Sequence, residues 1–150
     1  MHIRPARVDE AEALTELALR SKAHWGYDEA FMERCRRELT VTAADVRRGL
    51  TFVLEYAGRL QGFYALEPLS CRRIELALLF VAPDALGRGY GRALIAHALG
   101  RAAAHGCTVI EIQGDPHARG FYEAVGARLV GEAPSESIPG RMLPSFELSV

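Results

Sequence analysis

Residues 74–92 read I-E-L-A-L-L-F-V-A-P-D-A-L-G-R-G-Y-G-R, and the rest of the chain is placed around this stretch. Its first eight residues are mostly β-branched, aromatic or otherwise apolar, which predicts a strand. A Pro-Asp turn and three glycines at alternate positions follow, and a helix is expected from about Arg92. Glycines let a backbone approach a ligand closely, and the first N–H groups of a helix have no partner within it. The stretch therefore predicts a site for a phosphate-bearing ligand.

Strand and helix patterns alternate on both sides of this stretch. Before it, we expect a strand at 2–8, helices at 9–25, 28–39 and 42–48, and hairpin strands at 51–57 and 60–66, the second ended by Pro68. Asp9 with Glu12, and Thr42 with Asp45, are expected to cap the first and the third of these helices. After it, we expect a helix at 90–104, a strand at 107–113, a helix at 116–125, and strands at 127–131 and 143–150. The strands at 74–81 and 107–113 should be parallel, with a right-handed crossover. The sequence thus predicts an α/β domain with a mixed, mostly antiparallel central sheet of about seven strands and helices on both faces.

Composition limits the classes of function. A chain of 150 residues with 49% hydrophobic and 25% charged residues can bury one core without a disulfide or a metal. The net charge of −1 gives no support for binding nucleic acid or an anionic membrane. The three cysteines are far apart and form no Cys/His cluster, so we expect no metal and a reduced compartment. No apolar run approaches the roughly 20 residues of a membrane span, which favours a cytoplasmic protein.

The glycine-rich turn can be compared with other glycine-rich motifs that bind phosphate. The dinucleotide fingerprint G-x-G-x-x-G fails, because Arg92 stands where its third glycine would be. The phosphate loop of nucleotide hydrolases also fails, because no Gly-Lys-Ser/Thr follows. A turn that needs glycines for purely structural reasons remains an alternative.

What the stretch does resemble is the acetyl-CoA signature of the GNAT superfamily of N-acetyltransferases, R/Q-x-x-G-x-G/A, with L-G-R-G-Y-G at 86–91. A second segment, D-P-H-A-R-G-F-Y-E-A-V-G-A at 115–127, is similar to the family's Asn-x-x-Ala-x-x-Phe/Leu-Tyr-Glu-x-x-Gly-Phe. The departures are Leu86 for Gln or Arg, Asp115 for Asn, and Ala127 for an aromatic residue. The order of elements also fits, so the resemblance covers the whole chain. It implies a single N-acetyltransferase domain over residues 1–150 with the GNAT-like acyl-CoA N-acyltransferase fold.

The resemblance implies acetyl-CoA as cosubstrate and no metal. In the family, backbone groups of the central strand pair with the pantetheine arm, and backbone N–H groups of the glycine turn bind the pyrophosphate. The N–H of Leu79 would polarise the thioester carbonyl. Arg88 and Arg92 either add charge near the phosphates or are solvated. The coenzyme-binding residues implied are Leu79, Phe80, Val81, Gly87, Arg88, Gly89, Tyr90, Gly91, Arg92, Asp115, Ala118 and Phe121.

Two residues are candidates for proton transfer. Tyr122 matches the family's general acid, since a phenol with a pKa of about 10 can protonate a departing thiolate; the alternative is that Tyr122 only packs at a helix–strand junction. An attacking alkyl amine, with a pKa of roughly 10, must lose a proton. Glu75 lies four residues before Leu79 on the same strand face, which favours it as a base, although it equally suits an ordinary polar position. Glu111 is expected to face elsewhere.

The acceptor site of this superfamily is usually lined by the first helices, their connecting loop and the late strands. Here those segments are 21–28 and 137–141, and we expect His24, Trp25 and Tyr27 to contribute. The helical spacing of Trp25 instead favours a place in the core. His24, Tyr27 and His117 are weaker candidates for the base.

The resemblance implies transfer of an acetyl group from acetyl-CoA to a primary amine of a small molecule, peptide or protein, by direct attack in a ternary complex. The alternative is a non-catalytic acyl-CoA-binding or sensing module of the same fold. A homodimer is compatible with the family.

Overall fold

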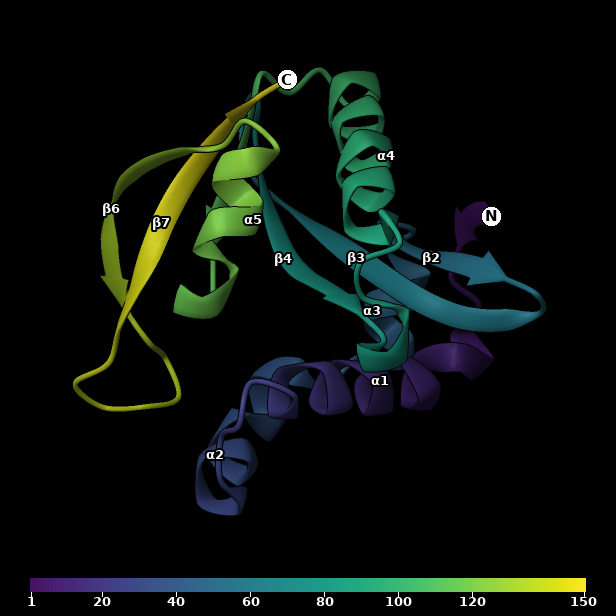
Figure 1. The fold of residues 1–150 in the computed structure, drawn as a ribbon. Coiled ribbons are helices and arrows are strands. Elements are labelled where there is room, and N and C mark those ends of the chain that lie inside the picture. Colours follow the sequence, from purple (N-terminus) through teal and green to yellow (C-terminus); the bar gives the residue numbers. More distant parts are fainter. The chain divides into compact units, whose positions relative to one another are not determined.

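The computed structural model describes all 150 residues, and Figure 1 shows its helices and strands. The strands are β1 (His2–Pro5), β2 (Thr51–Tyr56), β3 (Arg59–Ser70), β4 (Arg73–Val81), β5 (Val109–Gln113), β6 (Arg128–Pro134) and β7 (Met142–Ser149). The helices are α1 (Ala11–Ala23), α2 (Glu29–Leu39), α3 (Ala43–Arg47), α4 (Tyr90–Ala104) and α5 (Arg119–Ala124). Short 3-10 turns are η1 (Val8–Glu10), η2 (Pro83–Ala85) and η3 (Pro116–Ala118). Every helix and strand expected from the sequence is present, with ends that differ by a few residues.

The strands form one seven-stranded sheet in the order β1-β2-β3-β4-β5-β7-β6. β4 and β5 are parallel, whereas the pairs β1–β2, β2–β3, β5–β7 and β6–β7 are antiparallel. The prediction of a mixed, mostly antiparallel sheet is therefore confirmed. None of the helices combines the length and the hydropathy needed to cross a membrane.

The chain divides into two compact units. The first unit is Met1–Ala65 with Leu78–Leu94, and the second is Leu66–Ala77 with Ile95–Val150. Strands β3 and β4 and helix α4 each run from one unit into the other, so the two units are described in turn.

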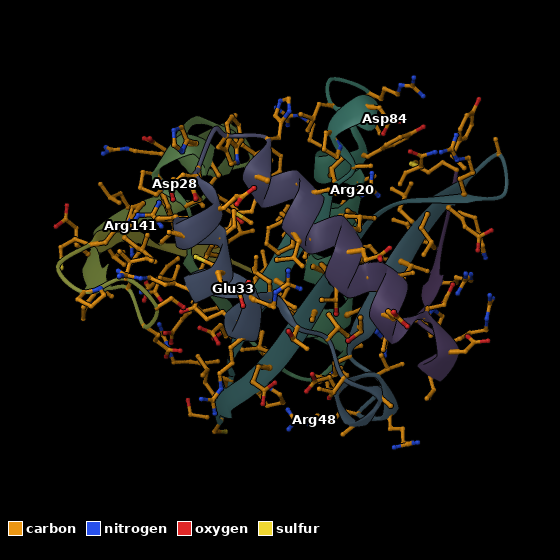
Figure 2. All side chains as sticks on the ribbon, turned by 90° about the horizontal axis from the view of Figure 1, so that it is seen from below. Arg20, Asp28, Glu33, Arg48, Asp84 and Arg141 are labelled. Carbon is orange, nitrogen blue, oxygen red and sulfur yellow. The ribbon has the colours of Figure 1, made fainter.

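In the first unit, an apolar face of α1 and the middle of the β2–β3 hairpin supply the core. Leu14, Leu17 and Ala18 recur at helical spacing on α1 and are fully or almost fully buried. Val53 and Phe63 are register partners in the hairpin and are both buried. Figure 2 labels three exposed residues of this unit: Arg20 on α1, Asp28 at the N-cap of α2, and Glu33 on α2.

The helix caps of the first unit differ in part from those expected. The predicted box at Thr42 is confirmed, because its Oγ1 accepts from the N–H of Asp45 at 3.1 Å and the Asp45 carboxylate accepts from the N–H of Thr42 at 2.9 Å. Asp9 does not cap the first helix and is exposed. The turn η1 precedes that helix, and the carboxylate of Glu10 accepts from the N–H of Arg7 at 2.8 Å.

The prediction that Pro68 ends its strand is wrong, since β3 continues to Ser70. The register explains why a proline is tolerated there. The last β2–β3 pair is Thr51 with Ala65, so Pro68 lies beyond the reach of β2 and its missing N–H costs no bond to that strand.

In the second unit, β5 and β7 supply alternating buried residues, among them Ile110, Ile112 and Phe146. β6 forms the edge of the sheet and is mostly exposed. The guanidinium of Arg73 on β4 bonds Glu111 on β5 and Glu147 on β7, each at 2.5 Å, and so links three neighbouring strands.

Candidate active site

In the first unit, the candidate binding segment is the turn between β4 and α4. Gly87 and Gly89 have φ angles of 80° and 82°, in the left-handed region that favours glycine. A Cβ added at either residue would meet nothing within 4 Å, so open space lies beside both. The helical bonds begin with the N–H of Ala93, which donates to the carbonyl of Gly89 at 3.1 Å. The N–H groups just before it have no acceptor within the helix and suit an anion.

The side chains of this turn differ in their exposure to solvent. Arg88 and Arg92 are exposed, as is Leu86, the residue that departs from the family signature. Asp84 lies in η2 just before the glycines (Figure 2) and is exposed. Tyr90 differs, because its ring is buried and lies 6.3 Å from the ring of Tyr56. Only the backbone of Tyr90 is therefore placed to contribute to an anion site.

The end of β4 leads into this turn. β4 pairs with β5 from Arg73 to Leu76, and β5 ends at Gln113, one residue past its last β4 partner. Residues 77–81, which include the predicted coenzyme contacts Leu79, Phe80 and Val81, therefore have no β5 partner. Their backbone groups on that edge can bond another extended group.

Gly62 on β3 allows β4 to lie close by. A Cβ at Gly62 would lie 2.9 Å from the Phe80 carbonyl oxygen and 3.1 Å from the Leu94 side chain. The N–H of Ala82 donates to the carbonyl of Gln61 at 2.8 Å, which fixes the chain as it leaves β4. The glycine at 62 thus sets the path of the strand that precedes the turn.

In the second unit, the candidate functional residue is Tyr122 on α5. Its ring is buried among aromatic rings, 5.5 Å from Phe146 and 5.3 Å from Phe121. Burial, and to a lesser degree the negative charge of Asp115, raise the pKa of the Tyr122 phenol above its ordinary value of 10. The phenol is consequently protonated throughout the neutral range and can act as a proton donor.

Asp115 occupies the position where the family usually has Asn. Its Oδ1 accepts from the N–H of His117 at 2.9 Å, which caps η3, and also lies 2.9 Å from His117 Nδ1. Its Oδ2 lies 3.4 Å from a guanidinium nitrogen of Arg141. Sequence reasoning included Arg141 in the acceptor segment 137–141 but missed its contact with Asp115, because the two residues are 26 positions apart and no local pattern links them. Ala118 completes the turn by donating its N–H to the Asp115 carbonyl at 2.8 Å.

Glu75 on β4 is half-buried and lies directly opposite Glu111 in the parallel β4–β5 register. Register partners in a parallel pair project from the same face, so the expectation that Glu111 faces elsewhere is wrong. Desolvation raises the pKa of the Glu75 carboxyl above its ordinary value, and the negative charges of Glu111, Glu136 and Glu67 raise it further. A carboxylate with a raised pKa is a stronger base than an ordinary glutamate.

The predicted acceptor residues lie in the first unit, where α1 ends. Trp25 is 43% exposed, so its predicted place in the core is wrong. The helix stops at Ala23, and helical spacing no longer decides which way residue 25 faces. The ring of His24 meets that of Trp25 edge-on at 5.9 Å.

Tyr27, the third predicted acceptor residue, packs locally. Its ring stacks on that of Phe31 at 4.0 Å, and the ammonium of Lys22 lies 5.6 Å from its centre. The predicted acceptor residues thus belong to two aromatic pairs, His24 with Trp25 and Tyr27 with Phe31 of α2.

No group of three or more His, Cys, Asp or Glu side chains lies together in a way that would hold a metal ion. The chemistry described above rests on backbone N–H groups, a phenol and a carboxyl.

Residues 11–127 match the Acetyltransferase (GNAT) family. Over 132 residues the chain is 26% identical to the 5-NmdU N-acetyltransferase of Pseudomonas phage PaMx11, which covers 87% of this chain and 89% of that protein. The fold is similar to that of PaiA N-acetyltransferase from Thermoplasma acidophilum in complex with coenzyme A, with a TM-score of 0.83, 19% identity, and coverage of 99% and 98% of the two chains. It is also similar to that of YncA from Salmonella typhimurium with acetyl-CoA, with a TM-score of 0.71, 19% identity, and coverage of 99% and 93%.

Proposed function

Because the chain belongs to the GNAT family of acetyltransferases, we propose that it transfers the acetyl group of acetyl-CoA to a primary amine by direct attack in a ternary complex. The observation that carries this proposal is the turn before α4. Its two left-handed glycines have open space beside them, and the N–H groups that follow precede the first helical bond. This arrangement suits the pyrophosphate of the coenzyme.

The coenzyme is bound mainly by backbone groups in this proposal. The N–H groups of residues 87–92 bond the pyrophosphate, while the unpaired edge of β4 at Leu79, Phe80 and Val81 bonds the pantetheine amides. The N–H of Leu79 donates to the thioester oxygen as negative charge develops on it. Arg88 and Arg92 are exposed, and they add positive charge near the phosphates.

The reaction joins the amine nitrogen to the acetyl carbon and breaks the carbon–sulfur bond. The thiolate that leaves takes the phenolic proton of Tyr122, which the raised pKa keeps on the oxygen at neutral pH. The nitrogen loses a proton to Glu75, directly or through one water. Glu75 then releases this proton to solvent, and solvent returns a proton to the phenol. The products are the N-acetylated amine and free coenzyme A.

The acceptor is an amine that reaches the site uncharged or loses its proton there. We place it with His24, Trp25 and Tyr27, whose aromatic rings offer an apolar wall. The phage relative is named for 5-NmdU, which makes 5-NmdU one acceptor to test beside small-molecule amines, amino acids and peptides.

The test measures coenzyme binding and turnover separately. Acetyl-CoA at about 100 times its Kd should stabilise the protein by about 2.7 kcal/mol and raise its melting temperature. An amine panel that includes 5-NmdU is then assayed for release of free coenzyme A thiol. Tyr122→Phe should lower kcat by about 100-fold and leave the Kd of acetyl-CoA within about twofold of wild type, because the lost proton donor acts on the leaving group.

The outcomes separate the candidate functions. Thermal stabilisation without thiol release across the panel would indicate an acyl-CoA-binding module rather than a working enzyme. An unchanged kcat in Tyr122→Phe would remove the phenol as the acid. Absence of any thermal shift with acetyl-CoA would contradict both functions.

A further inference from the structure

We propose that Gly114 is a positioning residue for Tyr122, because the absence of its side chain makes the space in which the phenol ring lies. This inference rests on the proposed function, in which Tyr122 is the proton donor. Gly114 directly follows β5, and nothing in the family signatures described above includes it.

The distances leave no room for a side chain at this position. A Cβ built on Gly114 would lie 2.9 Å from Cε2 and 3.1 Å from Cδ2 of Tyr122, and 3.4 Å from Cε2 of Phe146. Ordinary carbon–carbon contacts are about 3.5–4.0 Å. The flat face of the glycine backbone is therefore one wall of the Tyr122 site, and the Phe146 ring is another.

Backbone conformation does not account for this glycine. Gly87 and Gly89 need glycine because their φ angles are positive, whereas the φ of Gly114 lies outside the left-handed region. The N–H of Gly114 donates to the carbonyl of Pro144 on β7 at 3.0 Å, a bond that alanine would also make. The steric requirement of the Tyr122 ring therefore explains why residue 114 is glycine.

The neighbours of the ring cannot easily move to accept a methyl group. Tyr122 is 7% exposed and Phe146 only 1%, so both lie in packed surroundings. The residue after Gly114 is Asp115, whose carboxylate is tied to His117 and Arg141. A methyl group at 114 would therefore displace the phenol ring itself, by about half an ångström or more.

Such a displacement affects proton transfer from the phenol. It does not affect the protein backbone groups that bind the coenzyme. A misplacement of about 1 Å can lower a catalysed rate about 100-fold. We expect Gly114→Ala to lower kcat about tenfold and to leave the KM for acetyl-CoA within about twofold. The control is Gly100→Ala on α4, where a Cβ meets nothing within 4 Å and φ is not positive; its kcat should equal that of wild type.

Two variants at residue 122 test whether Gly114 acts through the ring. In Tyr122→Phe the hydroxyl is already gone, so adding Gly114→Ala should cause no further fall in kcat. In Tyr122→Leu the clashing atoms Cδ2 and Cε2 of the aromatic ring are gone. Adding Gly114→Ala should therefore lower the melting temperature less there than in the wild-type background, a comparison that holds even where activity is lost.

NMR spectroscopy can detect a displacement of the Tyr122 ring directly. In protein labelled with ¹³C at the tyrosine ring, Tyr122→Phe identifies the Tyr122 resonance. Gly114→Ala should shift that resonance, and Gly100→Ala should not.

Each result decides between the two proposals. A wild-type kcat and an unshifted resonance in Gly114→Ala would overturn the role of Gly114 while leaving the acid in place. An equal fall in kcat on adding Gly114→Ala to Tyr122→Phe would show a general structural effect and would also overturn it. A wild-type kcat in Tyr122→Phe alone would overturn the acid itself, and with it any role of Gly114 in the reaction.

Discussion

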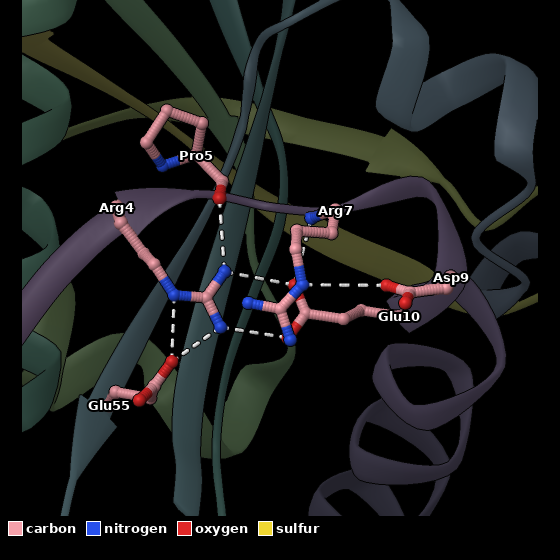
Figure 3. A network of polar contacts seen from close by, with 6 residues as sticks. All are labelled: Arg4, Pro5, Arg7, Asp9, Glu10 and Glu55. Atoms are coloured by element: carbon pink, nitrogen blue, oxygen red, sulfur yellow. Dashed lines mark hydrogen bonds and ion pairs between the residues drawn. The ribbon is translucent and has the colours of Figure 1, made fainter. Parts of the chain in front are cut away.

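Removing the guanidinium of Arg4 should destabilise the first unit strongly, because several acidic contacts depend on it (Figure 3). On Glu10, Arg4 bonds Oε1 at 3.0 Å and Oε2 at 2.8 Å. It also bonds Glu55 on β2 at 2.7 Å and the carbonyl of Pro5 at 3.1 Å. The side chains of Arg4 and Glu10 are only 16% and 10% exposed, so water cannot replace these bonds freely.

The expected magnitude follows from burial. Arg4→Met leaves the Glu10 carboxylate with the N–H and the exposed guanidinium of Arg7 as its remaining partners. Removing one member of a buried ion pair costs about 3–5 kcal/mol, because the other charge stays buried. For a chain of 150 residues each kcal/mol lowers Tm by about 2–4 °C, so we expect a fall of about 6–20 °C.

A double-mutant cycle distinguishes a lost attraction from a stranded charge. Glu10→Gln removes the charge that Arg4→Met strands, so the double variant should be more stable than Arg4→Met alone. Urea unfolding followed by circular dichroism at pH 7 gives the four free energies. A cost below about 1 kcal/mol for Arg4→Met would refute the reasoning, as would a double variant no more stable than that single one.

The same network gives a pH dependence with a definite sign. Hydrogen bonds from Arg4 lower the pKa of the Glu10 carboxyl below its ordinary value of 4.5, although burial opposes this. A lowered folded-state pKa contributes stability that is present above pH 4.5 and is lost as the pH falls through the folded-state pKa. The difference in stability between wild type and Glu10→Gln should therefore shrink as the pH falls below 4.5. An unchanged difference over this range would contradict the shifted pKa.

Two further predictions concern the reaction. Gly89→Glu should abolish the thermal shift with acetyl-CoA, since it places bulk and negative charge where the phosphates bind; Gly106→Glu, with φ of 73° and open space at its Cβ, carries the same strain and charge and should keep the shift. Glu75→Gln should remove the acidic limb of the kcat/KM profile, a limb centred above the ordinary value of 4.5 because the pKa of Glu75 is raised; an unaltered limb would exclude Glu75 as the base.

Local patterns in the sequence were sufficient for the elements and for the coenzyme turn. The glycines at 87 and 89 permit a left-handed backbone, and the apolar spacing beyond them predicts α4 with its observed ends at Tyr90 and Ala104. The parallel pairing of β4 with β5 followed from the intervening helix. These features depend on neighbours in the chain, which a single sequence displays.

Features that depend on pairing between distant segments were not predictable in the same way. The tolerance of Pro68 depends on where β2 begins, and the repulsion between Glu75 and Glu111 depends on strand register. The need for glycine at 114 depends on where a ring from another element comes to rest. The prediction that Trp25 lies in the core was wrong for a local reason, because the helix stops two residues before it.

The aspartate at position 115, where the family usually has asparagine, changes the charge around Tyr122. An aspartate caps η3 as an asparagine would, but burial already raises the pKa of the Tyr122 phenol, and the negative charge of Asp115 raises it further. The guanidinium of Arg141, 3.4 Å away, offsets part of that charge and joins the segment before β7 to the turn that carries Gly114. Gly114, Asp115 and Arg141 therefore act on one group: the first makes room for the phenol, and the other two set the charge around it.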